Sequence, residues 1–416
     1  MAIDNKDKKV LKSSIEREQN ELACSAEREK IKGSKNLNVP HLRFPEFSGE
    51  WEEHTLSEYL EFKNGLNPDA KRIGSGLPFI SVMDILSEGV INYDNIRGKV
   101  NATEKEIECF GVKDGDLLFQ RSSETLEDVG RANVYMDNRT AIYGGFVIRG
   151  RKIGNYDPLF FKYLLATPLA RKRTCRMGAG AQHFNIGQEG LSKISLYFPS
   201  IEEQRKIAEF LSLIDERIAT QNKIIEDLKK LKSAISLNVL HSDKWEQFKI
   251  KDIAQIGRGR VISSIEIGQQ KSPTYPVYSS QTSNDGIMGY LDDYMFEGEY
   301  ISWTTDGANA GTVFYRNGKF NCTNVCGLLK LRKEFDTHFV SLVLAEATKK
   351  YVSINLANPK LMNNTMGNIQ IRLPKLEEQK RISIVFRVLQ RLWTVHNSLL
   401  TEYTKQEQYL LSQMFI

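Results

Sequence analysis

The sequence has few cysteines and lacks any long hydrophobic run. Its 416 residues include 5 cysteines, an odd number scattered along the chain, which does not indicate a disulfide framework. No apolar run approaches the roughly 20 residues needed to cross a bilayer, and no charged-then-apolar signal segment opens the chain. These absences argue against a disulfide-stabilised secreted protein and against a membrane protein, and they favour the reducing cytoplasm.

The motifs of nucleotide-binding and methyl-transferring enzymes are also missing. The sequence contains neither a Gly-x-x-x-x-Gly-Lys-Ser/Thr loop nor a Gly-x-Gly-x-x-Gly turn after a strand. Adenine methyltransferases carry Asn/Asp-Pro-Pro followed by an aromatic residue. Here Asp157-Pro158 and Asn358-Pro359 each lack the second proline, so both indicate the start of a helix or turn.

Two further patterns have ordinary structural explanations. Cys322 and Cys326 have no second pair and no nearby histidine to complete a metal site, so we expect buried structural cysteines. The glycine-rich residues 177–181 follow a basic segment and indicate a flexible loop. We therefore expect no catalytic constellation and no metal in this chain, and the predicted role is recognition.

Positive charge is concentrated in one part of the sequence. The chain has 57 Lys and Arg against 52 Asp and Glu, which gives a net charge of +5. Between residues 149 and 176, eight basic residues accompany a single acidic residue, Asp157. A local excess of this kind is typical of a nucleic-acid-binding face, although ordinary solvated surface produces the same pattern.

The clearest pattern is an internal repeat. Residues 198–207 read Phe-Pro-Ser-Ile-Glu-Glu-Gln-Arg-Lys-Ile, and 175 positions later residues 373–382 read Leu-Pro-Lys-Leu-Glu-Glu-Gln-Lys-Arg-Ile. Upstream, Trp51-Glu52 with Gly65 matches Trp245-Glu246 with Gly259, which stand 194 positions later. Two similar units therefore follow one another, and the first is longer between its landmarks.

Each repeat ends in a predicted long helix. A proline precedes Glu-Glu-Gln, and acidic residues suit the positive N-terminal end of a helix. Apolar residues then recur at alternating steps of four and three, which is the heptad pattern of a coiled coil. Polar residues interrupt both stripes at matching places, Gln221 with His396 and Lys232 with Glu407. We predict that the two helices pack antiparallel with Gln221 meeting His396, rather than each stripe packing only on its own domain. The predicted seam consists of Ile207, Leu211, Ile214, Ile218, Gln221, Ile225 and Leu228, facing Ile382, Phe386, Leu389, Trp393, His396, Leu400 and Tyr403.

The segments before the helices mix short apolar runs with turns, which predicts an α+β fold. Residues 158–170 and 337–353 look helical. Strands are predicted at residues 117–119, 146–148 and 194–198 in the first segment, and at 277–278, 300–303, 312–315 and 369–373 in the second. The predicted boundaries are a charged tail or helix at 1–38, domains at 39–200 and 243–375, and long helices at 201–242 and 376–416.

This order of features resembles the specificity subunit of type I restriction–modification systems. The resemblance rests on the repeated set of Trp-Glu, Pro, Glu-Glu-Gln and heptad helix, together with Leu-Arg-Phe-Pro-Glu-Phe at 42–47 and Leu-Leu-Ser-Gln-Met-Phe at 410–415. It covers about residues 39–416. It implies two similar target recognition domains joined by two long antiparallel coiled-coil helices with pseudo-two-fold symmetry. Each domain would read one half of a split DNA sequence.

The resemblance also implies partners. Double-stranded DNA, two methyltransferase subunits and restriction (motor-nuclease) subunits would assemble around this chain. S-adenosylmethionine, ATP and Mg²⁺ are then expected on the partner subunits, and no cofactor is expected here. The chain itself would be a non-catalytic specificity subunit that supplies the address for DNA methylation.

Candidate DNA contacts follow from side-chain chemistry. Arg reads guanine and Asn or Gln reads adenine, while other basic side chains hold phosphates. Residues 278–281 and 304–309 resemble the family's recognition loops. In the first domain the candidates are Arg121, Ser122, Ser123, Arg131, Arg171, Lys172, Arg173, Arg176, Gln182, His183 and Asn185. In the second they are Arg258, Arg260, Tyr278, Ser279, Ser280, Gln281, Thr304, Thr305, Asn309 and Lys360.

Two other classes of function remain open at this point. The chain could be a coiled-coil scaffold that binds proteins and not DNA, or a nuclease with an unrecognised carboxylate site such as Asp114, Asp116 and Glu124. Salt-dependent binding to duplex DNA would distinguish a DNA-recognition subunit from a protein scaffold. Mg²⁺-dependent cleavage by the isolated chain would distinguish a nuclease from a non-catalytic subunit.

Overall fold

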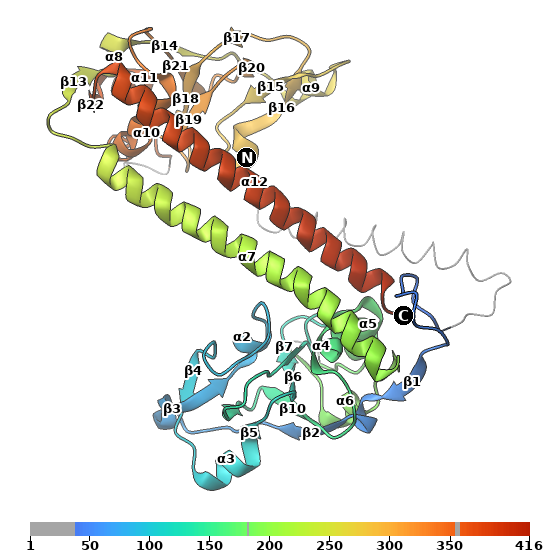
Figure 1. Cartoon of the computed structure of the whole chain (residues 1–416). Coiled ribbons are helices and arrows are strands. Elements are labelled where there is room, and N and C mark those ends of the chain that lie inside the picture. Colours follow the sequence, from blue (N-terminus) through green and yellow to red (C-terminus); the bar gives the residue numbers. More distant parts are fainter. Residues whose placement is uncertain (1–37, 181–182, 354–357) are drawn as a thin grey trace. The chain divides into compact units, whose positions relative to one another are not determined.

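The computed structural model describes residues 38–180, 183–353 and 358–416 (Figure 1). They form two compact units. Unit 1 contains the chain up to Ala219 together with Glu402–Ile416, and unit 2 contains Thr220–Thr401. The predicted tail or helix at residues 1–38 lies outside the described residues, apart from Asn38. Unit 1 therefore takes residues from both ends of the chain, which the sequence-order boundaries did not anticipate.

Unit 1 contains two four-stranded sheets and two short strand pairs. The first sheet is antiparallel, with the order β2 (Leu60–Asn64), β10 (Val147–Lys152), β6 (Leu117–Gln120), β8 (Ala132–Val134). The second has the order β4 (Gly98–Val100), β3 (Ile73–Ile80), β9 (Ala141–Tyr143), β5 (Gly111–Val112), and β3 runs parallel to β9. The strand pairs are β1 (Glu52–Thr55) with β12 (Ser195–Phe198), and β7 (Ser122–Ser123) with β11 (Phe184–Asn185).

Short helices cover the sheets of unit 1. They are α2 (Val82–Ile85), α3 (Glu104–Phe110), α4 (Pro158–Ala166), α5 (Pro168–Arg176) and α6 (Gln188–Ser192), with 3₁₀ turns η1 (Leu56–Glu58) and η2 (Ala70–Arg72). The single helix predicted at 158–170 is two helices. Thr167 ends α4 in an extended conformation, because the residue before a proline disfavours the helical region. Its side chain then caps α5 by accepting from the Ala170 backbone.

Unit 2 repeats this topology. Its first sheet is β14 (Ala254–Arg258), β21 (Cys326–Leu331), β18 (Tyr300–Thr304), β19 (Val313–Arg316), and its second is β16 (Ile287–Leu291), β15 (Tyr275–Tyr278), β20 (Lys319–Cys322), β17 (Phe296–Glu297). Strand β15 runs parallel to β20, as β3 does to β9. Strand β13 (Glu246–Lys249) pairs with β22 (Gln370–Leu373). The helices are α8 (Ile250–Ile253), α9 (Ser264–Gly268), α10 (Thr337–Ala347) and α11 (Asn363–Asn368), with 3₁₀ turns η3 (Ser283–Gly286) and η4 (Thr348–Lys350). The helix predicted at 337–353 therefore ends as α10 and the turn η4.

The repeated glycines have a steric reason. A Cβ on Gly65 would lie 2.1 Å from the carbonyl oxygen of Gly144, and a Cβ on Gly259 would lie 1.6 Å from that of Cys322. In each unit the chain next makes a parallel bridge, from Leu66 in unit 1 and from Arg260 in unit 2. Only glycine permits this approach of two backbones.

Both units join the α+β domain to the long helix through the same hydrogen bonds. In unit 1, the Gln204 side chain donates to the Pro199 carbonyl at 3.0 Å and accepts from the Asp157 backbone at 3.1 Å. Asp157 in turn caps α4 by accepting from the Phe160 backbone at 2.8 Å. In unit 2 the same three bonds are made by Gln379, Pro374, Asp336 and Phe339, at 2.8, 3.0 and 2.7 Å. The repeated glutamine is therefore a structural residue.

The long helices are α7 (Ile201–Val239) and α12 (Leu376–Gln413). In unit 1 their contacts include a hydrogen bond of 3.4 Å from Arg217 to the Tyr403 hydroxyl. In unit 2, His396 Nδ1 lies 2.7 Å from Gln221 Oε1, and Lys232 Nζ lies 3.3 Å from Gln390 Oε1. Within each unit, α7 is therefore antiparallel to α12, and the predicted meeting of Gln221 with His396 is confirmed.

The helix ends and part of the seam differ from the prediction. Helix α7 ends three residues before position 242, because the chain turns through Ser242 and Asp243 into β13, where Arg372 binds the Asp243 carbonyl at 2.7 Å. The seam residues nearest the domains are buried, whereas Trp393 is 36% exposed. The buried seam residues are Ile207, Leu211, Ile214, Ile225, Ile382, Phe386 and Leu389.

Candidate nucleic-acid interface

Two separate groups of candidate residues in unit 1 come together. Ser122 and Ser123 form β7, which pairs with Phe184 and Asn185 in β11, and Ser122 Oγ donates to Asn185 Oδ1. The carbonyl of Arg121 accepts from the Ile186 backbone at 3.0 Å. A loop after β6 and a segment about sixty positions later therefore make one polar ribbon. His183 is exposed beside it, and Gln182 lies outside the described residues.

The glycine-rich segment is attached to this ribbon. Ala179 and Asn185 exchange two backbone hydrogen bonds, of 3.0 and 2.9 Å. The described part of residues 177–181 is therefore not the free loop that its glycines indicated. The glycines permit close approach here, because a Cβ on Gly180 would lie 2.0 Å from the His183 carbonyl oxygen.

The basic cluster on α5 is divided between structural and exposed side chains. Arg171 Nη2 donates to the carbonyls of Glu127 and Val129 at 2.8 and 2.7 Å, and burial lowers the pKa of its guanidinium. Arg173 pairs with Glu53 at 2.8 Å and donates to the Ser195 carbonyl. These two arginines connect α5 to other segments of unit 1. The local sequence predicted them as DNA contacts and did not indicate this structural role. Lys172 and Arg176, by contrast, are exposed.

The candidates of unit 2 are divided in the same way. Thr304 and Thr305 are each 1% exposed, so neither side chain is placed to contact DNA. Asn309 is exposed in the loop that follows. This loop is fastened to residues 359–361, because Gly307 donates to the Pro359 carbonyl at 3.0 Å and Leu361 donates to that of Thr305 at 2.8 Å. Lys360 is exposed between these bonds.

Around β15 the structure adds a residue that the sequence analysis missed. Arg316 is 2% exposed, stacks 3.6 Å from the Tyr278 ring and pairs with Asp285 at 2.9 Å. Asp285 and Asn284 have positive φ angles of 52° and 49°. Gln281 bonds the Ile287 carbonyl beside them, and Ser279 and Ser280 are half-buried. No local pattern marks Arg316, because its partners come from two other strands and a turn.

Three other candidate arginines have protein partners. Arg131 pairs with Asp128 at 2.8 Å, and Arg260 pairs with Glu266 at 2.9 Å between Nη1 and Oε2. Arg258 donates to Asn363 at 2.9 Å. All three arginines are exposed, so exchanging the ion pair of Arg131 or Arg260, or the hydrogen bond of Arg258, for a phosphate costs little.

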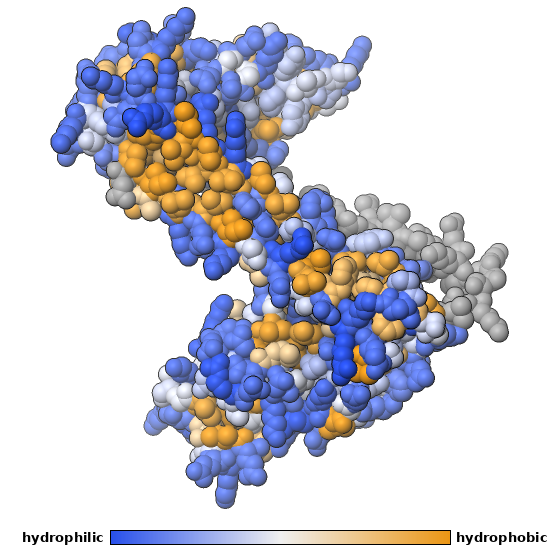
Figure 2. All heavy atoms as spheres, in the orientation of Figure 1, coloured by the Kyte–Doolittle hydropathy of each residue, from blue (hydrophilic) through white to orange (hydrophobic). Residues whose placement is uncertain are grey.

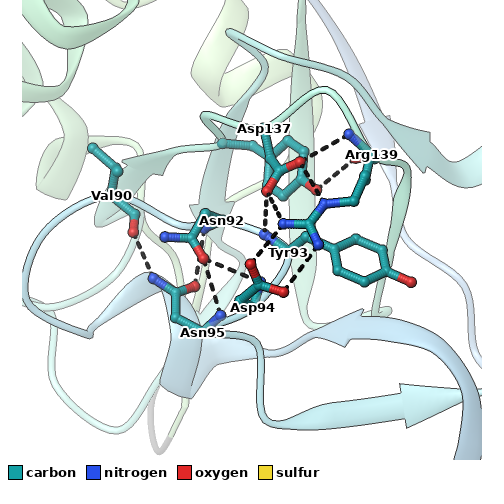
Figure 3. A network of polar contacts seen from close by, with 8 residues as sticks. Val90, Asn92, Tyr93, Asp94, Asn95, Asp137 and Arg139 are labelled. Atoms are coloured by element: carbon teal, nitrogen blue, oxygen red, sulfur yellow. Dashed lines mark hydrogen bonds and ion pairs between the residues drawn. The ribbon is translucent and has the colours of Figure 1, made fainter.

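A polar network in unit 1 was not anticipated (Figure 3). The Arg139 guanidinium bonds Asp94 at 2.7 and 3.0 Å and Asp137 at 2.8 and 3.0 Å, and lies 4.3 Å from the Tyr93 ring. Hydrogen bonds from Arg139 lower the pKa of both carboxyl groups. Two carboxylates share this arginine, so the network carries a net negative charge and fastens the loop at 90–95 to the turn after β8.

The carboxylates considered for a nuclease do not form a metal site. Asp116 is 1% exposed, pairs with Arg151 at 3.1 Å and accepts from the Lys113 backbone at 2.9 Å. Burial raises the pKa of Asp116. Across the described ranges, no three His, Cys, Asp or Glu side chains are grouped to hold a metal ion. In the same part of the chain, no helix is long and apolar enough to cross a membrane.

Comparison with known sequences gives one consistent family. The family described as "Type I restriction modification DNA specificity domain" matches residues 48–230 and 242–403. A Mycoplasma pneumoniae protein whose name describes a proposed type I specificity subunit is 37% identical over 205 residues, which cover 49% of this chain and 85% of that protein. The specificity subunit of the type I restriction enzyme MpnII from the same organism is 42% identical over 149 residues, which cover 36% of this chain and 44% of that subunit.

Solved structures agree on the fold. The S subunit of a type I restriction–modification system from M. genitalium matches with a TM-score of 0.67 and 16% identity, covering 91% of this chain and 99% of that one. A chain from a study of complex assembly and conformational transition of the type I system matches with a TM-score of 0.52 and 14% identity, covering 90% and 99%. The predicted α+β architecture, with its two similar domains and two long helices, is thereby confirmed.

Proposed function

Because the chain belongs to the family of type I restriction–modification DNA specificity domains, we propose that it is the sequence-specific DNA-recognition subunit of such a system and reads a bipartite target. The observation that carries the proposal is the duplication of one complete domain. Both units have the same strand order, the same parallel strand pair and the same glutamine network at the helix start. Two similar DNA-binding domains in one chain suit a DNA target with two separated halves.

The proposed DNA contacts are candidates that are exposed or half-buried at the surface. In unit 1 these are the β7–β11 ribbon with Lys172 and Arg176, and in unit 2 they are Asn309 and Lys360 with the 278–281 turn. Three further exposed candidates join them as proposed phosphate contacts, namely Arg131, Arg258 and Arg260. Phosphate contacts position a protein on DNA, and base-edge contacts specify the sequence. We expect the β7–β11 ribbon and residues 278–281 to contact base edges and so specify the sequence. We expect the two lysines and Arg176 to contact phosphates and so position the protein on the DNA.

The test is binding to duplex DNA as salt is varied, together with mapping of the methylated sequence. Replacing Lys172 and Arg176 with alanine should weaken binding to all sequences and reduce the salt slope by about one per lost phosphate contact. Changes at Ser122 and Ser123 should alter one half of the target, and changes at Tyr278 and Gln281 the other. Changes that leave both halves intact would reject this interface, and salt-independent or absent DNA binding would favour a protein scaffold.

We further propose that methyltransferase subunits dock on the long helices and that restriction subunits join through them. Support comes from a second apolar stripe on α12, at spacings of three and four, that lies outside the seam. Its residues Val385, Val388, Leu392, Val395 and Leu399 are between 38% and 54% exposed. Figure 2 shows the hydrophobic area over the first half of α12. S-adenosylmethionine, ATP and Mg²⁺ would then belong to those partners, and this chain would remain non-catalytic.

Replacing Leu392 and Val395 with aspartate tests the docking proposal. Association with the methyltransferase subunit, measured by sedimentation, should be lost while DNA binding by the isolated chain is kept. The matched control is Leu237→Asp, an exposed leucine of α7 (77%) whose counterpart on α12 is Ser412 and lies outside the stripe. Cleavage of DNA by the isolated chain in Mg²⁺ would contradict the non-catalytic assignment.

A further inference from the structure

The start of α7 in unit 1 is covered by the chain's own residues 38–50, which we name the 38–50 segment. Its Arg43 binds Glu203 through two hydrogen bonds, of 2.8 Å from Nε and 2.7 Å from Nη2, and the Glu203 side chain is 2% exposed. The Leu42 backbone donates to the Gln413 carbonyl at 2.8 Å. The segment is thus fixed to α7 and to the last turn of α12.

Two further contacts complete the cover. The Phe44 ring meets the Phe210 ring edge to face, with 5.9 Å between centroids. Glu46 binds the Lys206 ammonium group, which also lies 5.0 Å from the centre of the Phe44 ring. Two turns of α7, between Glu203 and Phe210, therefore recognise the sequence Arg-Phe-Pro-Glu through a buried carboxylate, an aromatic ring and a cation.

Unit 2 has the same helix start without the cover. The residues 175 positions later are Glu378, Arg381 and Val385, so the anion and the cation are kept and the ring becomes a smaller apolar side chain. All three are exposed. Within the described part of the chain, no ion pair or side-chain hydrogen bond satisfies Glu378 or Arg381. Together with Ile235, Val239, Ile382, Lys375 and Glu377 they line an open groove of about 690 Å³.

The connection between the repeats explains why this groove is open. Helix α7 ends at Val239 and β13 begins at Glu246, so six residues join them. Aligning Trp245 with Trp51 places residues 232–244 opposite the 38–50 segment, and most of those residues belong to α7. Among the described residues, one covering segment is therefore present for two equivalent helix starts.

We infer that the groove at the start of α12 binds an extended segment of another polypeptide with the chemistry of the 38–50 segment: a basic residue, an aromatic residue, a proline and then an acidic residue. The basic residue would pair with Glu378 and the acidic residue with Arg381, which is the charge order that unit 1 uses. The aromatic ring would lie on Val385 and Ile382, where the missing Phe210 ring leaves additional room. This inference goes beyond the proposed function, because it holds whether or not the chain binds DNA.

The test uses a fluorescent peptide with the sequence of residues 39–50 and the full-length protein. Fluorescence anisotropy should show saturable binding, and Glu378→Lys should weaken it at least about tenfold, since charge-assisted hydrogen bonds to a carboxylate are lost. The matched control is Glu226→Lys, which changes an exposed glutamate of α7 in the same unit that does not line the groove. This variant has the same change of charge and should bind the peptide nearly normally.

A charge exchange and a cross-link remove the remaining ambiguity. A peptide with glutamate in place of its arginine should bind Glu378→Lys better than it binds the unaltered protein. A photo-cross-linking residue placed at position 385 should capture the added peptide. Peptide binding that ignores Glu378→Lys would mean exchange with the 38–50 segment in unit 1 and would overturn the inference. Absence of binding, or capture of residues 1–37 or of a second copy in place of the peptide, would also overturn it.

Discussion

The helix start of unit 1 and that of unit 2 have nearly the same sequence and different surroundings. Gln204 and Gln379 make the same hydrogen bonds in both, because their partners are repeated with them. Glu203 is buried under Arg43, whereas Glu378 is exposed, because the residue that covers Glu203 comes from a segment that is present once. The comparison teaches that a repeated motif keeps its role only where its contacts are repeated as well.

The largest expected effect comes from separating the two ends of unit 1. A fragment of residues 1–243 lacks Leu410, Met414 and Phe415, which are buried in the core of unit 1. Their repeat counterparts are Ile235, Val239 and Leu240, at the end of α7. A second copy of the fragment can supply these side chains about a two-fold axis, so we expect a dimer.

Sedimentation of the fragment at micromolar concentration checks this expectation. A soluble folded monomer would contradict it. If the dimer forms, its two identical domains should direct methylation to a palindrome when the methyltransferase subunit is present. Methylation of a non-palindromic site would show that the domains are not related by a two-fold axis.

The next effect separates the two glutamates. Glu203→Ala removes one partner of a buried bidentate pair and leaves Arg43 uncompensated, so it should destabilise unit 1 by roughly 3 kcal/mol or more. Glu378→Ala removes an exposed carboxylate and should change stability by less than about 0.5 kcal/mol. Hydrogen exchange, which reports each unit separately, measures both. Equal losses in the two variants would show that the difference in burial has no energetic consequence.

The repeated glutamines should behave alike. Gln204→Ala and Gln379→Ala each leave a buried proline carbonyl and a half-buried backbone N–H without their glutamine partner. Each change should cost about 1–3 kcal/mol in its own unit. Chemical denaturation followed by hydrogen exchange gives the two values, and a difference of more than about 1 kcal/mol would mean that the networks are not equivalent.

At neutral pH the smallest expected effect comes from a titration confined to unit 2, which becomes large only in acid. Burial, with Arg387 nearby, lowers the pKa of His338 to about 4, while its Nδ1 lies 2.9 Å from Ser383 Oγ. An unfolded histidine titrates near pH 6.5, so the unfolded state binds the proton more tightly. The contribution of His338 is therefore complete above about pH 6.5 and is lost as the pH falls toward 4.

His338→Leu provides the comparison with unit 1, where Leu159 occupies the matching position. The variant should remove the additional loss of stability of unit 2 between pH 6.5 and 4, and unit 1 should show no such change between the two proteins. Titration of His338 by NMR gives the pKa directly. A value near 6.5 in the folded protein would reject the explanation.

Several features of this protein were determined by local sequence. The steps of four and three place apolar side chains on one face of a helix, so α7 and α12 and the meeting of Gln221 with His396 could be predicted from their spacing. The strands around 117–119, 300–303 and 369–373 could also be predicted from local sequence, because each is a short apolar run bounded by turn residues.

Tertiary structure alone decided which polar candidates face solvent. Arg171 donates to backbone carbonyls and Arg173 pairs with a carboxylate, and these partners come from distant segments. Lys172 between them is exposed. The local sequence Arg-Lys-Arg does not indicate which of the three side chains is exposed. Thr304 is buried where β18 pairs with β21, and Thr305 is held by two hydrogen bonds to the Val325 carbonyl, which lies twenty positions later. Arg316 is positioned by partners from three different elements. Such contacts depend on how segments far apart in the chain come together, and that information is absent from any short stretch of sequence.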